Sequence, residues 1–520
     1  MVVPTGPELP SISTLIAIAS EYGIELTREE ADAYRTAMAP AISSYRRVEE
    51  MTEPKLPVRY KRDSGWRPDA GDNPLNAWYW RCEIEGASSG PLKGERVAIK
   101  DAICVAGLPM MNGTRLLEGY IPDIDATVVT RLLDAGATIV GKTNTEDHSF
   151  SGSGHLSSHG PVRNPRKPSH NPGASSCGSA AAIGAGDVDL ALGGDQGGSI
   201  RIPASWSGVY GLKPSYGLVP YTGCAMIEHT MDHIGPMANS SEGIARLLSV
   251  MAGVDPLDPR QRGMIPAGLS TDYTSALKRG VRGMRIAVVK EGFGLPGVEQ
   301  GPPPSDPVVD ETVRAALERF RKMGADVEEV SLPAHRDGMD VYVAIMMEGA
   351  TEFMLKAGGG GTNWSGWHNT QLVEAYLKGM RARPHDIPPT VISVLLTGEY
   401  VRRAYFGRYY CRGQNIRPQI TAAYEAVLKN YDLIAMPTTP IRATPIPGRD
   451  VSIAENLQTA FSMLRNTCVA DVTGHPSISL PCGMADGLPI GMMLTGRHFD
   501  DAGVIAASAA FEADHDWSRG

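Results

Sequence analysis

Cysteine and long apolar runs are both scarce in this 520-residue sequence. The 7 cysteines are odd in number and widely spaced, and none forms a C-x-x-C pair, which argues against a disulfide framework and against structural zinc. No apolar run approaches the roughly 18 residues that a membrane-spanning helix needs. The N-terminus lacks the basic and apolar regions of a secretory signal. These absences predict a cytoplasmic protein with no membrane partner.

Positive charge is also in deficit. Lysine and arginine together number 49 against 58 aspartates and glutamates, so the formal net charge is −9, and no block of basic residues stands out. Such a chain is not expected to bind nucleic acid. With 42% hydrophobic residues, the chain is long enough for one large core plus an appendage.

Several familiar catalytic motifs are missing. The sequence contains no P-loop, no G-x-G-x-x-G, no G-x-S-x-G and no H-E-x-x-H. Residues 275–278 (SALK) match S-x-x-K, but the S-D-N and K-T-G motifs of penicillin-binding proteins do not accompany them, so we attribute the match to chance. His155, His159 and His170 lie in a long Gly- and Ser-rich segment, where a metal site or a Ser-His-Asp triad stays open.

The most informative stretch of the chain is residues 171–203. It contains two glycine- and serine-rich clusters, residues 173–179 and 193–199, separated by an alanine-rich segment and a short apolar run. This alternation predicts loop, helix, strand and loop, which would bring both serine-bearing loops to one end of a sheet. Because a tight Gly-Gly-Ser turn can point successive N–H groups at one oxyanion, a serine nucleophile competes here with a phosphate-binding loop.

Three motifs, which follow one another along the chain in the family's order, resemble those of the amidase signature family of serine hydrolases. Residues 193–203 (GGDQGGSIRIP), followed by residues 208–214 (GVYGLKP), resemble the family signature. Residues 173–179 (GASSCGS) occupy its Gly/Ser-rich position upstream, and residues 97–101 (VAIKD) resemble its lysine-bearing strand. The resemblance covers roughly residues 86–510. It implies an α/β amidase-signature fold with a large mixed central sheet flanked by helices.

Local patterns support an α/β interpretation independently of that resemblance. Strands and helices alternate in a βαβ rhythm over much of the chain. We expect helices at residues 125–135, 310–323 and 501–512, and strands at residues 137–140, 188–192, 285–289, 327–332, 431–440, 476–482 and 488–496.

The resemblance assigns the catalytic roles residue by residue. Ser199 would be the nucleophile, Ser175 the bridging serine and Lys100 the general base. An amide carbonyl is a poor electrophile, so the attacking hydroxyl must be activated by an adjacent base. Lysine acts as a base only when it is neutral, which requires burial or nearby positive charge to lower a pKa that is normally about 10.4. Ser175 would relay the proton from Ser199 to Lys100.

The resemblance also implies roles for the groups around the nucleophile. Asp195 and Arg201 would brace the loop without transferring protons. No metal and no cofactor is implied. The oxyanion hole would be formed by consecutive backbone N–H groups of the turn, those of Gln196, Gly197, Gly198 and Ser199.

One position departs from the family pattern. The residue before the bridging serine is commonly glycine in this family, where a cis peptide bond precedes the serine, and here it is Ala174. A non-proline cis bond costs roughly 3 kcal/mol, and a Cβ adds crowding. Ser176 would take the place of Ser175 if the register were off by one. Cys177 lies in the same loop, but the family position is not catalytic.

Residues 1–85 are predicted to form a separate, mostly helical domain before the catalytic domain at 86–520. Residues 12–22 have helical periodicity, and residues 27–30 (TREE) have the spacing of a capping box that opens a second helix toward Met51. Such a segment resembles the amidases that follow nitrile hydratase in nitrile degradation. The resemblance implies a homodimer in which these helices contribute to the interface and cover the entrance of the active site. A packing appendage is the alternative.

The resemblance thus implies an amidase that hydrolyses small aliphatic or aromatic carboxamides to a carboxylic acid and ammonia through a Ser199 acyl-enzyme. One alternative is the glutamine-hydrolysing subunit of a tRNA-dependent amidotransferase. Leu464 argues against it, since we expect that subunit's substrate-binding aspartate there, upstream of residues 474–476 (GHP). A non-catalytic scaffold on the same fold is a second alternative, but it would be expected to lose triad residues, and all three are present.

The acyl group of the substrate is not specified by these motifs. Met226, Ile227, Trp364 and Trp367 suggest an apolar pocket, although apolar residues belong more often to the core. The glycine run at residues 357–361 fits either a mobile lid or a surface excursion.

Overall fold

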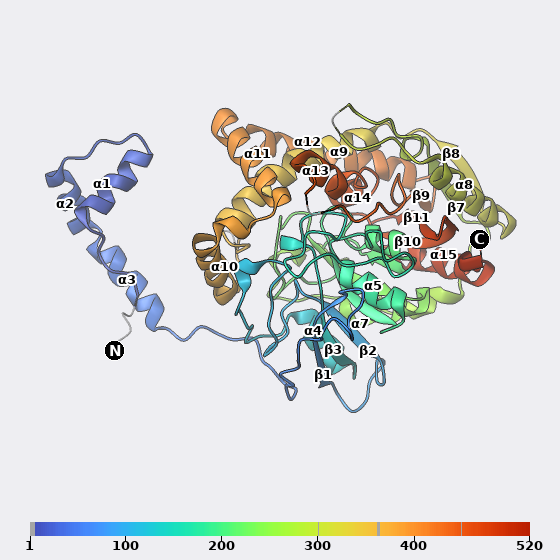
Figure 1. Cartoon of the computed structure of the whole chain (residues 1–520), viewed down its shortest axis with the longest axis horizontal. Coiled ribbons are helices and arrows are strands. Elements are labelled where there is room, and N and C mark those ends of the chain that lie inside the picture. The colour runs from blue at the N-terminus through green and yellow to red at the C-terminus, as the bar shows by residue number, and fades with distance from the viewer. Residues whose placement is uncertain (1–5, 300, 361–363, 449, 520) are drawn as a thin grey trace. The chain divides into compact units, whose positions relative to one another are not determined.

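The computed structural model describes residues 6–299, 301–360, 364–448 and 450–519. The chain divides into two compact units, Met1–Pro57 and Val58–Gly520 (Figure 1). Within the described residues, no helix combines the length and the apolar character needed to cross a membrane.

The small unit contains three helices, α1 (Ile12–Glu21), α2 (Arg28–Ala37) and α3 (Ala39–Glu50). The predicted capping box is confirmed, because the Thr27 hydroxyl accepts the Glu30 N–H while the Glu30 carboxylate accepts the Thr27 N–H. The sequence predicted one helix toward Met51, but the chain breaks at Met38. Pro40 explains the break, since its ring lacks an N–H and would collide with the carbonyl of Thr36 in a continuous helix.

The described residues of the large unit form a mixed 11-stranded sheet with the order β1-β3-β2-β4-β6-β5-β10-β11-β9-β7-β8. Its strands are β1 (Trp78–Glu85), β2 (Arg96–Lys100), β3 (Thr138–Thr143), β4 (Leu190–Asp195), β5 (Tyr210–Lys213), β6 (His233–Ala238), β7 (Arg285–Val289), β8 (Asp326–Val330), β9 (Leu433–Pro437), β10 (Ser477–Ala485) and β11 (Leu488–Gly496). The predicted α/β class with a large mixed sheet is confirmed.

Two parallel groups of strands lie at the ends of the order, β2 with β3 and β4, and β7 with β8 and β9. Antiparallel pairs join them through β6, β5, β10 and β11. Strand β1 pairs antiparallel with β3 at the edge, with Trp80 opposite Lys142. Residues 58–85, which the sequence analysis grouped with the N-terminal helices, therefore lie in the large unit.

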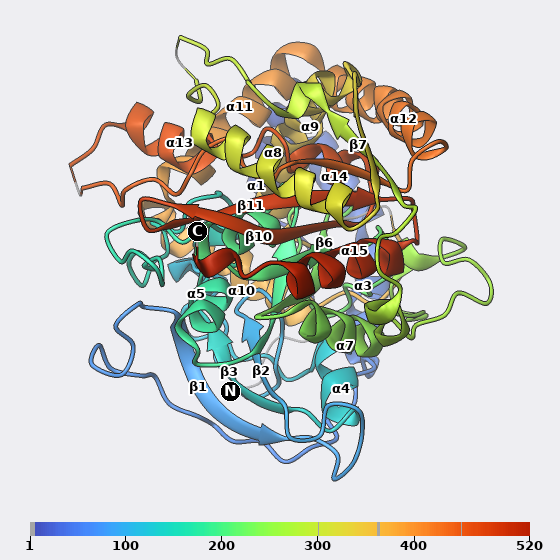
Figure 2. The same cartoon turned by 90° about the vertical axis from the view of Figure 1, so that its right-hand side faces the viewer.

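Helices pack on most strands of this sheet. Helices α7, α8 and α15 pack against β6, β10 and β11 (Figure 2), while α5 and α6 pack together and against β4 and β5 respectively. Helices α9, α11, α12 and α14 form a further packed group. The helices are α4 (Thr127–Asp134), α5 (Cys177–Ala185), α6 (Arg201–Ser207), α7 (Ser241–Met251), α8 (Pro307–Lys322), α9 (Ala334–Ala350), α10 (Thr370–Ala382), α11 (Pro389–Tyr405), α12 (Arg408–Leu428), α13 (Ile453–Phe461), α14 (Cys468–Thr473) and α15 (Asp501–Asp514).

Candidate active site

The proposed catalytic residues gather where two neighbouring parallel strands end. Strands β2 and β4 are parallel, with Ala98 opposite Ala191, so their carboxyl ends lie at the same edge of the sheet. Lys100 is the last residue of β2, and its ammonium donates a hydrogen bond to the carbonyl oxygen of Gly194 at 3.3 Å. The loop carrying Ser199 then leaves β4 at this edge.

Lys100 and Ser175 are in direct contact. The Lys100 Nζ lies 2.8 Å from the Ser175 Oγ, and both side chains are fully buried. Burial disfavours the ammonium form and lowers the pKa of Lys100 from 10.5 to about 8. The peptide bond between Ala174 and Ser175 is cis. Alanine stands before the bridging serine here, where the family commonly has glycine. The geometry thus supplies a buried amine of lowered pKa against a serine hydroxyl.

Ser199 lies beside this pair. The Ser176 N–H donates to the Ser199 carbonyl oxygen at 3.1 Å, which ties the two serine-bearing loops together. The Ser199 side chain makes no hydrogen bond with any described residue, and the residue is 7% exposed. Its hydroxyl is therefore open to an incoming substrate.

The neighbours of Ser175 are engaged elsewhere. The Ser176 hydroxyl donates to the Gly194 carbonyl oxygen at 3.2 Å and accepts the Gly194 N–H at 3.1 Å, so it acts as a clamp on β4. Cys177 is buried at the start of α5, and burial raises the pKa of its thiol. A thiol held protonated in this way is a poor nucleophile.

A buried charge network braces the loop between β4 and α6. Arg201 donates to both carboxylate oxygens of Asp195 at 3.0 Å, and also to Asp471 of α14 at 2.8 Å. Asp195 in turn accepts the N–H groups of Gly198 (2.6 Å) and Ile200 (3.0 Å). Burial alone would raise the pKa of Asp195, but the Arg201 charge and these hydrogen bonds outweigh it and hold that pKa well below the usual range.

The same network bears on the backbone donors around Ser199. The Gly198 N–H, which the resemblance assigned to the oxyanion hole, is donated to Asp195. The N–H groups of Gln196, Gly197 and Ser199 make no hydrogen bond within the described part of the chain. Tight packing fixes this turn: the Thr467 hydroxyl donates to the Gly197 carbonyl oxygen at 2.7 Å, and a Cβ on Gly197 would lie 2.3 Å from the Tyr342 hydroxyl.

A narrow cleft of about 20 Å³ opens at Ser199. Its walls come from the loop after β3, the Ser199 loop, α9 and the region around α13. Only uncharged side chains line it among the described residues: Ser149, Phe150, Ser151, Gln196, Gly197, Ser199, Ile227, Tyr342, Met346, Phe461 and Leu464. The cleft is therefore suited to an uncharged group with apolar parts.

The apolar residues singled out in the sequence separate into two places. Ile227 lines the Ser199 cleft, but Met226, Trp364 and Trp367 line a different small cavity beside Gly358–Gly360. Residues 357–360 of the glycine run follow the wide helical turn Thr351–Lys356, and residue 361 lies outside the described residues. Three of the four residues therefore do not form the wall of the cleft.

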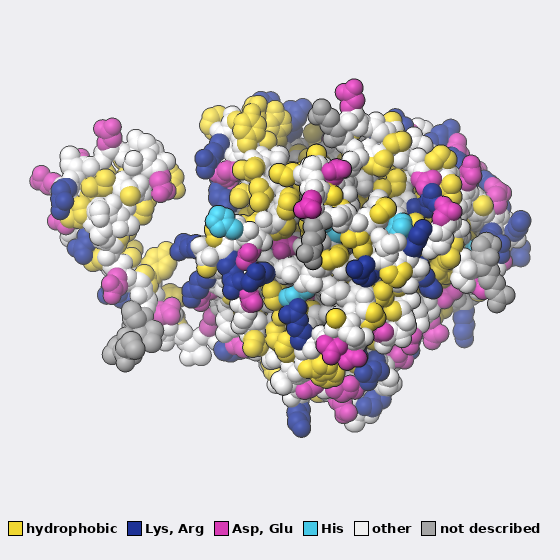
Figure 3. All heavy atoms as spheres, in the orientation of Figure 1, with side chains coloured by type: hydrophobic (Ala, Val, Ile, Leu, Met, Phe, Trp, Pro, Cys, Tyr) yellow, Lys and Arg dark blue, Asp and Glu magenta, His cyan; other side chains and the backbone are white. Residues whose placement is uncertain are grey.

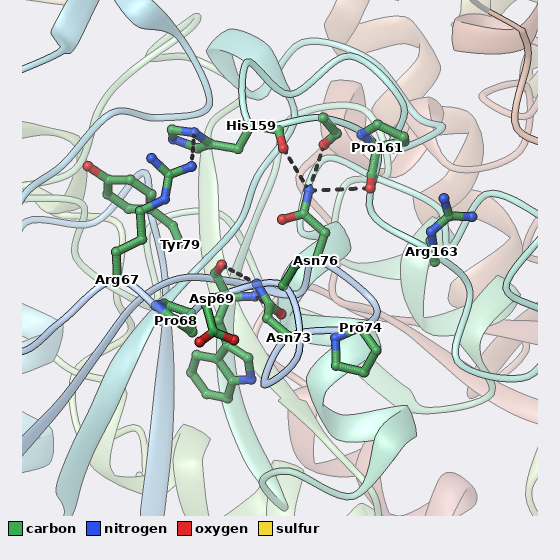
Figure 4. A pocket seen from close by; sticks show the side chains of 13 residues that line it. Arg67, Pro68, Asp69, Asn73, Pro74, Asn76, Tyr79, His159, Pro161 and Arg163 are labelled. Atoms are coloured by element: carbon green, nitrogen blue, oxygen red, sulfur yellow. Dashed lines mark hydrogen bonds between the residues drawn. The ribbon is translucent and has the colours of Figure 1, made fainter.

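The loop histidines belong to other surroundings. His159 lines a larger cavity of about 480 Å³, where its ring stacks on Tyr79 with centroids 4.7 Å apart and its Nδ1 lies 3.1 Å from Arg67 Nη2 (Figure 4). Asn76 holds the same loop by donating to the carbonyl oxygens of His159, Gly160 and Pro161. His155 contacts Ser153, and His170 contacts Ser169. In the described residues these histidines do not gather into a metal-ligand cluster.

Several residues that complete the site were not found from the sequence. Asp471, Thr467 and Tyr342 lie more than 140 residues from Ser199 in the chain, and their contacts with its loop are purely tertiary. Tyr221, which accepts from the Gln196 amide at 3.0 Å, is closer but sits in an irregular segment.

Comparison with known proteins places these motifs in a family. Residues 76–505 match the model of the family described as Amidase. An "Enantioselective amidase" from Rhodococcus rhodochrous is 42% identical over 510 residues, which is 97% of this chain and 95% of the relative. A glutamyl-tRNA(Gln) amidotransferase subunit from Methanosarcina acetivorans is 36% identical over 445 residues, 84% of this chain and 87% of the relative.

Solved structures agree with this assignment. A glutamyl-tRNA(Gln) amidotransferase subunit from Thermotoga maritima superposes with a TM-score of 0.67 at 30% identity, over 83% of this chain and 86% of the other. The native peptide amidase from Stenotrophomonas maltophilia superposes with a TM-score of 0.66 at 28% identity, over 82% and 83% of the two chains. A bacterial aryl acylamidase of the amidase signature family gives 0.66 at 27% identity, over 83% and 84%.

Proposed function

The chain belongs to the amidase signature family and is an amidase, and from this premise we propose that it hydrolyses small uncharged carboxamides to a carboxylic acid and ammonia through an acyl-enzyme on Ser199. Lys100 is the general base and Ser175 the bridging serine. The observation that carries the proposal is the buried contact of 2.8 Å between the Lys100 amine and the Ser175 hydroxyl, beside an unbonded Ser199 hydroxyl.

In this mechanism the Ser199 oxygen attacks the amide carbon while its proton passes to Ser175, whose own proton passes to Lys100. With a pKa of about 8, roughly a tenth of Lys100 is neutral and able to accept that proton at pH 7. The same proton returns through Ser175 to the departing nitrogen, which leaves as ammonia. Water then attacks the acyl-enzyme by the same route and releases the acid.

The negative charge that develops on the carbonyl oxygen is stabilised by backbone donors of the turn. The free N–H groups of Gln196, Gly197 and Ser199 support this role, whereas the Gly198 N–H serves the loop through Asp195. Loss of one such donor typically costs about 3 kcal/mol of barrier. Asp195 and Arg201 act on the reaction by fixing the turn.

The charge of the cleft sets the substrate class. No charged side chain lines the cleft among the described residues, so a zwitterion such as glutamine would leave an ammonium and a carboxylate without partners. Leu464 lines this cleft, at the position where the sequence analysis looked for an amidotransferase aspartate. Apolar walls that include Phe150 and Phe461 favour a neutral aliphatic or aromatic acyl group, which the cleft of about 20 Å³ admits once its walls move apart.

The experiment that tests the function is ammonia release from propionamide, benzamide and free glutamine by the wild-type chain and by Ser199→Ala. We expect turnover of the neutral amides, with activity falling at least about a thousandfold in the variant while its melting temperature is unchanged. Turnover of glutamine alone would instead favour the amidotransferase-like activity. Residual activity above that level in Ser199→Ala would show that another nucleophile acts.

The two enantiomers of a 2-substituted propionamide then test whether the cleft discriminates between them, as the name of the Rhodococcus relative suggests.

We also propose that the chain is a cytoplasmic homodimer and that its substrate is supplied by hydration of a nitrile. The match to the Rhodococcus amidase extends over 97% of this chain, whereas the Methanosarcina match covers 84%.

Exposed apolar side chains support a dimer interface. In the small unit Tyr22 and Val48 are 78% and 65% exposed. On the large unit hydrophobic side chains gather over α11 (Figure 3), among them Leu396 and Tyr400.

A further inference from the structure

Away from the active site, two histidines and a glutamate converge from three separate elements. Glu425 lies on α12, His475 follows α14, and His498 follows β11. Glu425 Oε1 is 2.6 Å from His498 Nδ1 and 3.2 Å from His475 Nε2. One ligand atom from each residue lies within 4.8 Å of those of the other two, and no other such group occurs among the described residues.

The tautomer of His498 makes its contact with Glu425 unusual. His498 Nε2 lies 2.9 Å from the Thr473 carbonyl oxygen, and because a carbonyl can only accept, Nε2 must carry the hydrogen. In the neutral ring Nδ1 is then a lone-pair acceptor, and it points at the carboxylate of Glu425. Two acceptors at 2.6 Å repel each other unless a cation lies between them. A proton fits this distance as it stands, whereas a metal ion, with bonds of about 2.0–2.1 Å, fits once the two atoms move apart.

His475 supplies an independent observation. Its side chain is fully buried, and neither ring nitrogen makes a hydrogen bond within the described residues. Its Nε2 is aimed at the same Glu425 oxygen, and its ring stacks on His498 with centroids 3.9 Å apart. A buried imidazole whose polar contact is a 3.2 Å approach to that carboxylate, without hydrogen-bond geometry, is poorly satisfied, and a proton shared between His498 and Glu425 does not change this. A metal ion would engage all three residues.

We propose that Glu425, His475 and His498 bind a divalent transition-metal ion of the zinc class. Two imidazole nitrogens and one carboxylate oxygen are a ligand set that zinc accepts, with water in the fourth position. The water is reachable because the side chains of His498 and Glu425 are 31% and 46% exposed. The bond from His498 Nε2 to the Thr473 carbonyl oxygen is the outer-shell contact that orients a metal-bound imidazole. Chelation requires the two rings to rotate out of their stacked arrangement.

The site would add to hydrogen bonds that already join these elements, from Arg417 of α12 to the carbonyl oxygen of Val472 and from Arg497 to that of Leu428. It would tie α12 to the residues that follow α14 and β11, and α14 carries Asp471, the partner of Arg201 in the loop brace. None of the three ligands lines the Ser199 cleft, so the ion has no step in amide hydrolysis. Its role is structural, and its loss is expected to lower the melting temperature before it alters the chemistry.

The test is a titration of Co²⁺ into the full chain, purified without a polyhistidine tag and freed of metal by EDTA. We expect one equivalent to bind with the visible absorption bands of a tetrahedral site, Zn²⁺ to displace it, and Zn²⁺ to raise the melting temperature. His498→Asn and Glu425→Gln are expected to weaken binding on the order of 100-fold. His385→Asn, at an exposed histidine elsewhere, is the matched control and is expected to bind as the wild type does.

Two outcomes would overturn the proposal. The first is wild-type protein that takes up no Co²⁺ at one equivalent, in which case Glu425 and His498 share a proton. The second is His498→Asn or Glu425→Gln that binds as tightly as the wild type. Glu425 is the safer of the two positions for folding, because its side chain is 46% exposed. Neither outcome depends on turnover of any amide, so the result is separate from that of the activity assay.

Discussion

At the scale of single residues, the proposed mechanism depends on a lysine that is kept away from water. Lys100 is fully buried, and its contacts are the Ser175 hydroxyl and the Gly194 carbonyl oxygen. Carboxylates in the surroundings, among them Asp195, oppose the effect of burial, but burial prevails and the pKa falls to about 8. The amine thus becomes a usable base near neutral pH without a histidine.

The pKa of Lys100 makes a prediction about rate. Because only the neutral amine can accept a proton, kcat/KM for a neutral amide should rise about tenfold per pH unit below the pKa and level off above pH 8. Lys100→Ala should lose both the activity and the inflection. No histidine lines the cleft among the described residues, so the inflection would not come from a histidine. A rate that is flat between pH 6.5 and pH 9 would remove Lys100 as the base.

Glu146 is a second buried ionisable residue near the site. Its carboxyl accepts the Ser151 hydroxyl at 2.5 Å and the Leu156 N–H at 3.2 Å, while its own N–H donates to the Ser175 carbonyl oxygen at 3.3 Å. Burial raises the pKa of Glu146 from 4.5 to about 7, more than these hydrogen bonds lower it. The folded state therefore favours the neutral carboxyl.

This pKa links stability to pH. The contribution of a neutral Glu146 is complete below pH 4.5 and is lost as the pH rises through about 7. Glu146→Gln stays neutral, so its free energy of unfolding relative to that of the wild type should increase between pH 5 and pH 8, by up to roughly 3 kcal/mol. Melting curves at constant ionic strength measure this. The exposed Glu311→Gln is the control, and an offset in Glu146→Gln that does not change with pH would contradict the linkage.

At the scale of elements, the loop between β4 and α6 is held by two carboxylates that share one arginine. Asp195 and Asp471 are both fully buried against Arg201. Burial and the neighbouring Asp195 raise the pKa of Asp471 well above its usual range, while Arg201 and backbone donors keep the pKa of Asp195 low. The pKa values of the two carboxyls are therefore shifted in opposite directions, and Asp195 is the more acidic of the pair.

That asymmetry predicts unequal effects of the same substitution. Asp195→Asn leaves the Arg201 charge buried without its counter-ion and should cost about 3 kcal/mol or more in the free energy of unfolding, together with most of the activity. Asp471→Asn keeps an oxygen acceptor for Arg201 and should cost about 1 kcal/mol. Urea unfolding and kcat/KM of both variants measure the difference. Equal losses in the two variants would mean that Asp471 is also ionised.

The elements near the signature could be predicted from the sequence because their patterns are local. The strands expected at residues 285–289 and 488–496 are confirmed as β7 and β11 with the same bounds, and the helix expected at residues 125–135 is confirmed as α4. Helices α9 to α12 were not predicted. The 21-residue α12 buries only Gly413, Ile420, Tyr424 and Leu428 and contains Pro418, and the buried face of α9 includes the polar residues His335 and Glu348. An apolar pattern marks such faces only weakly.

The candidate site could also be predicted only where its residues lie in local sequence patterns. The residues proposed as the triad lie in short motifs with glycine or apolar neighbours, and Lys100 and Ser175 are indeed in contact. The resemblance was needed to single them out, since a lysine at the end of a strand is ordinarily solvated. Asp471 and the Glu425, His475 and His498 cluster depend on contacts between distant segments, which no local pattern encodes.

At the scale of the whole molecule, the two units differ in how much hydrophobic core they contain. The large unit contains the 11-stranded sheet and the cores that pack on it. The helices α1, α2 and α3 bury only Ala19 and Ala31 among their described residues. A unit with so little core needs a partner surface to be stable, which is what the proposed homodimer would supply.

Removal of residues 1–57 tests this. The truncated chain keeps β1 and the whole sheet, so we expect a folded protein whose circular dichroism spectrum loses only the helical signal of α1, α2 and α3. We expect it to be a monomer by light scattering, where the full chain is a dimer. Removal of residues 1–85 is the contrasting control: it also deletes β1, uncovers the edge of β3 and should give an aggregating product. Two results would contradict a role of the helices in assembly. One is a full chain that is monomeric, and the other is a chain that lacks residues 1–57 and remains dimeric. The second result would leave the apolar surface of α11 as the interface.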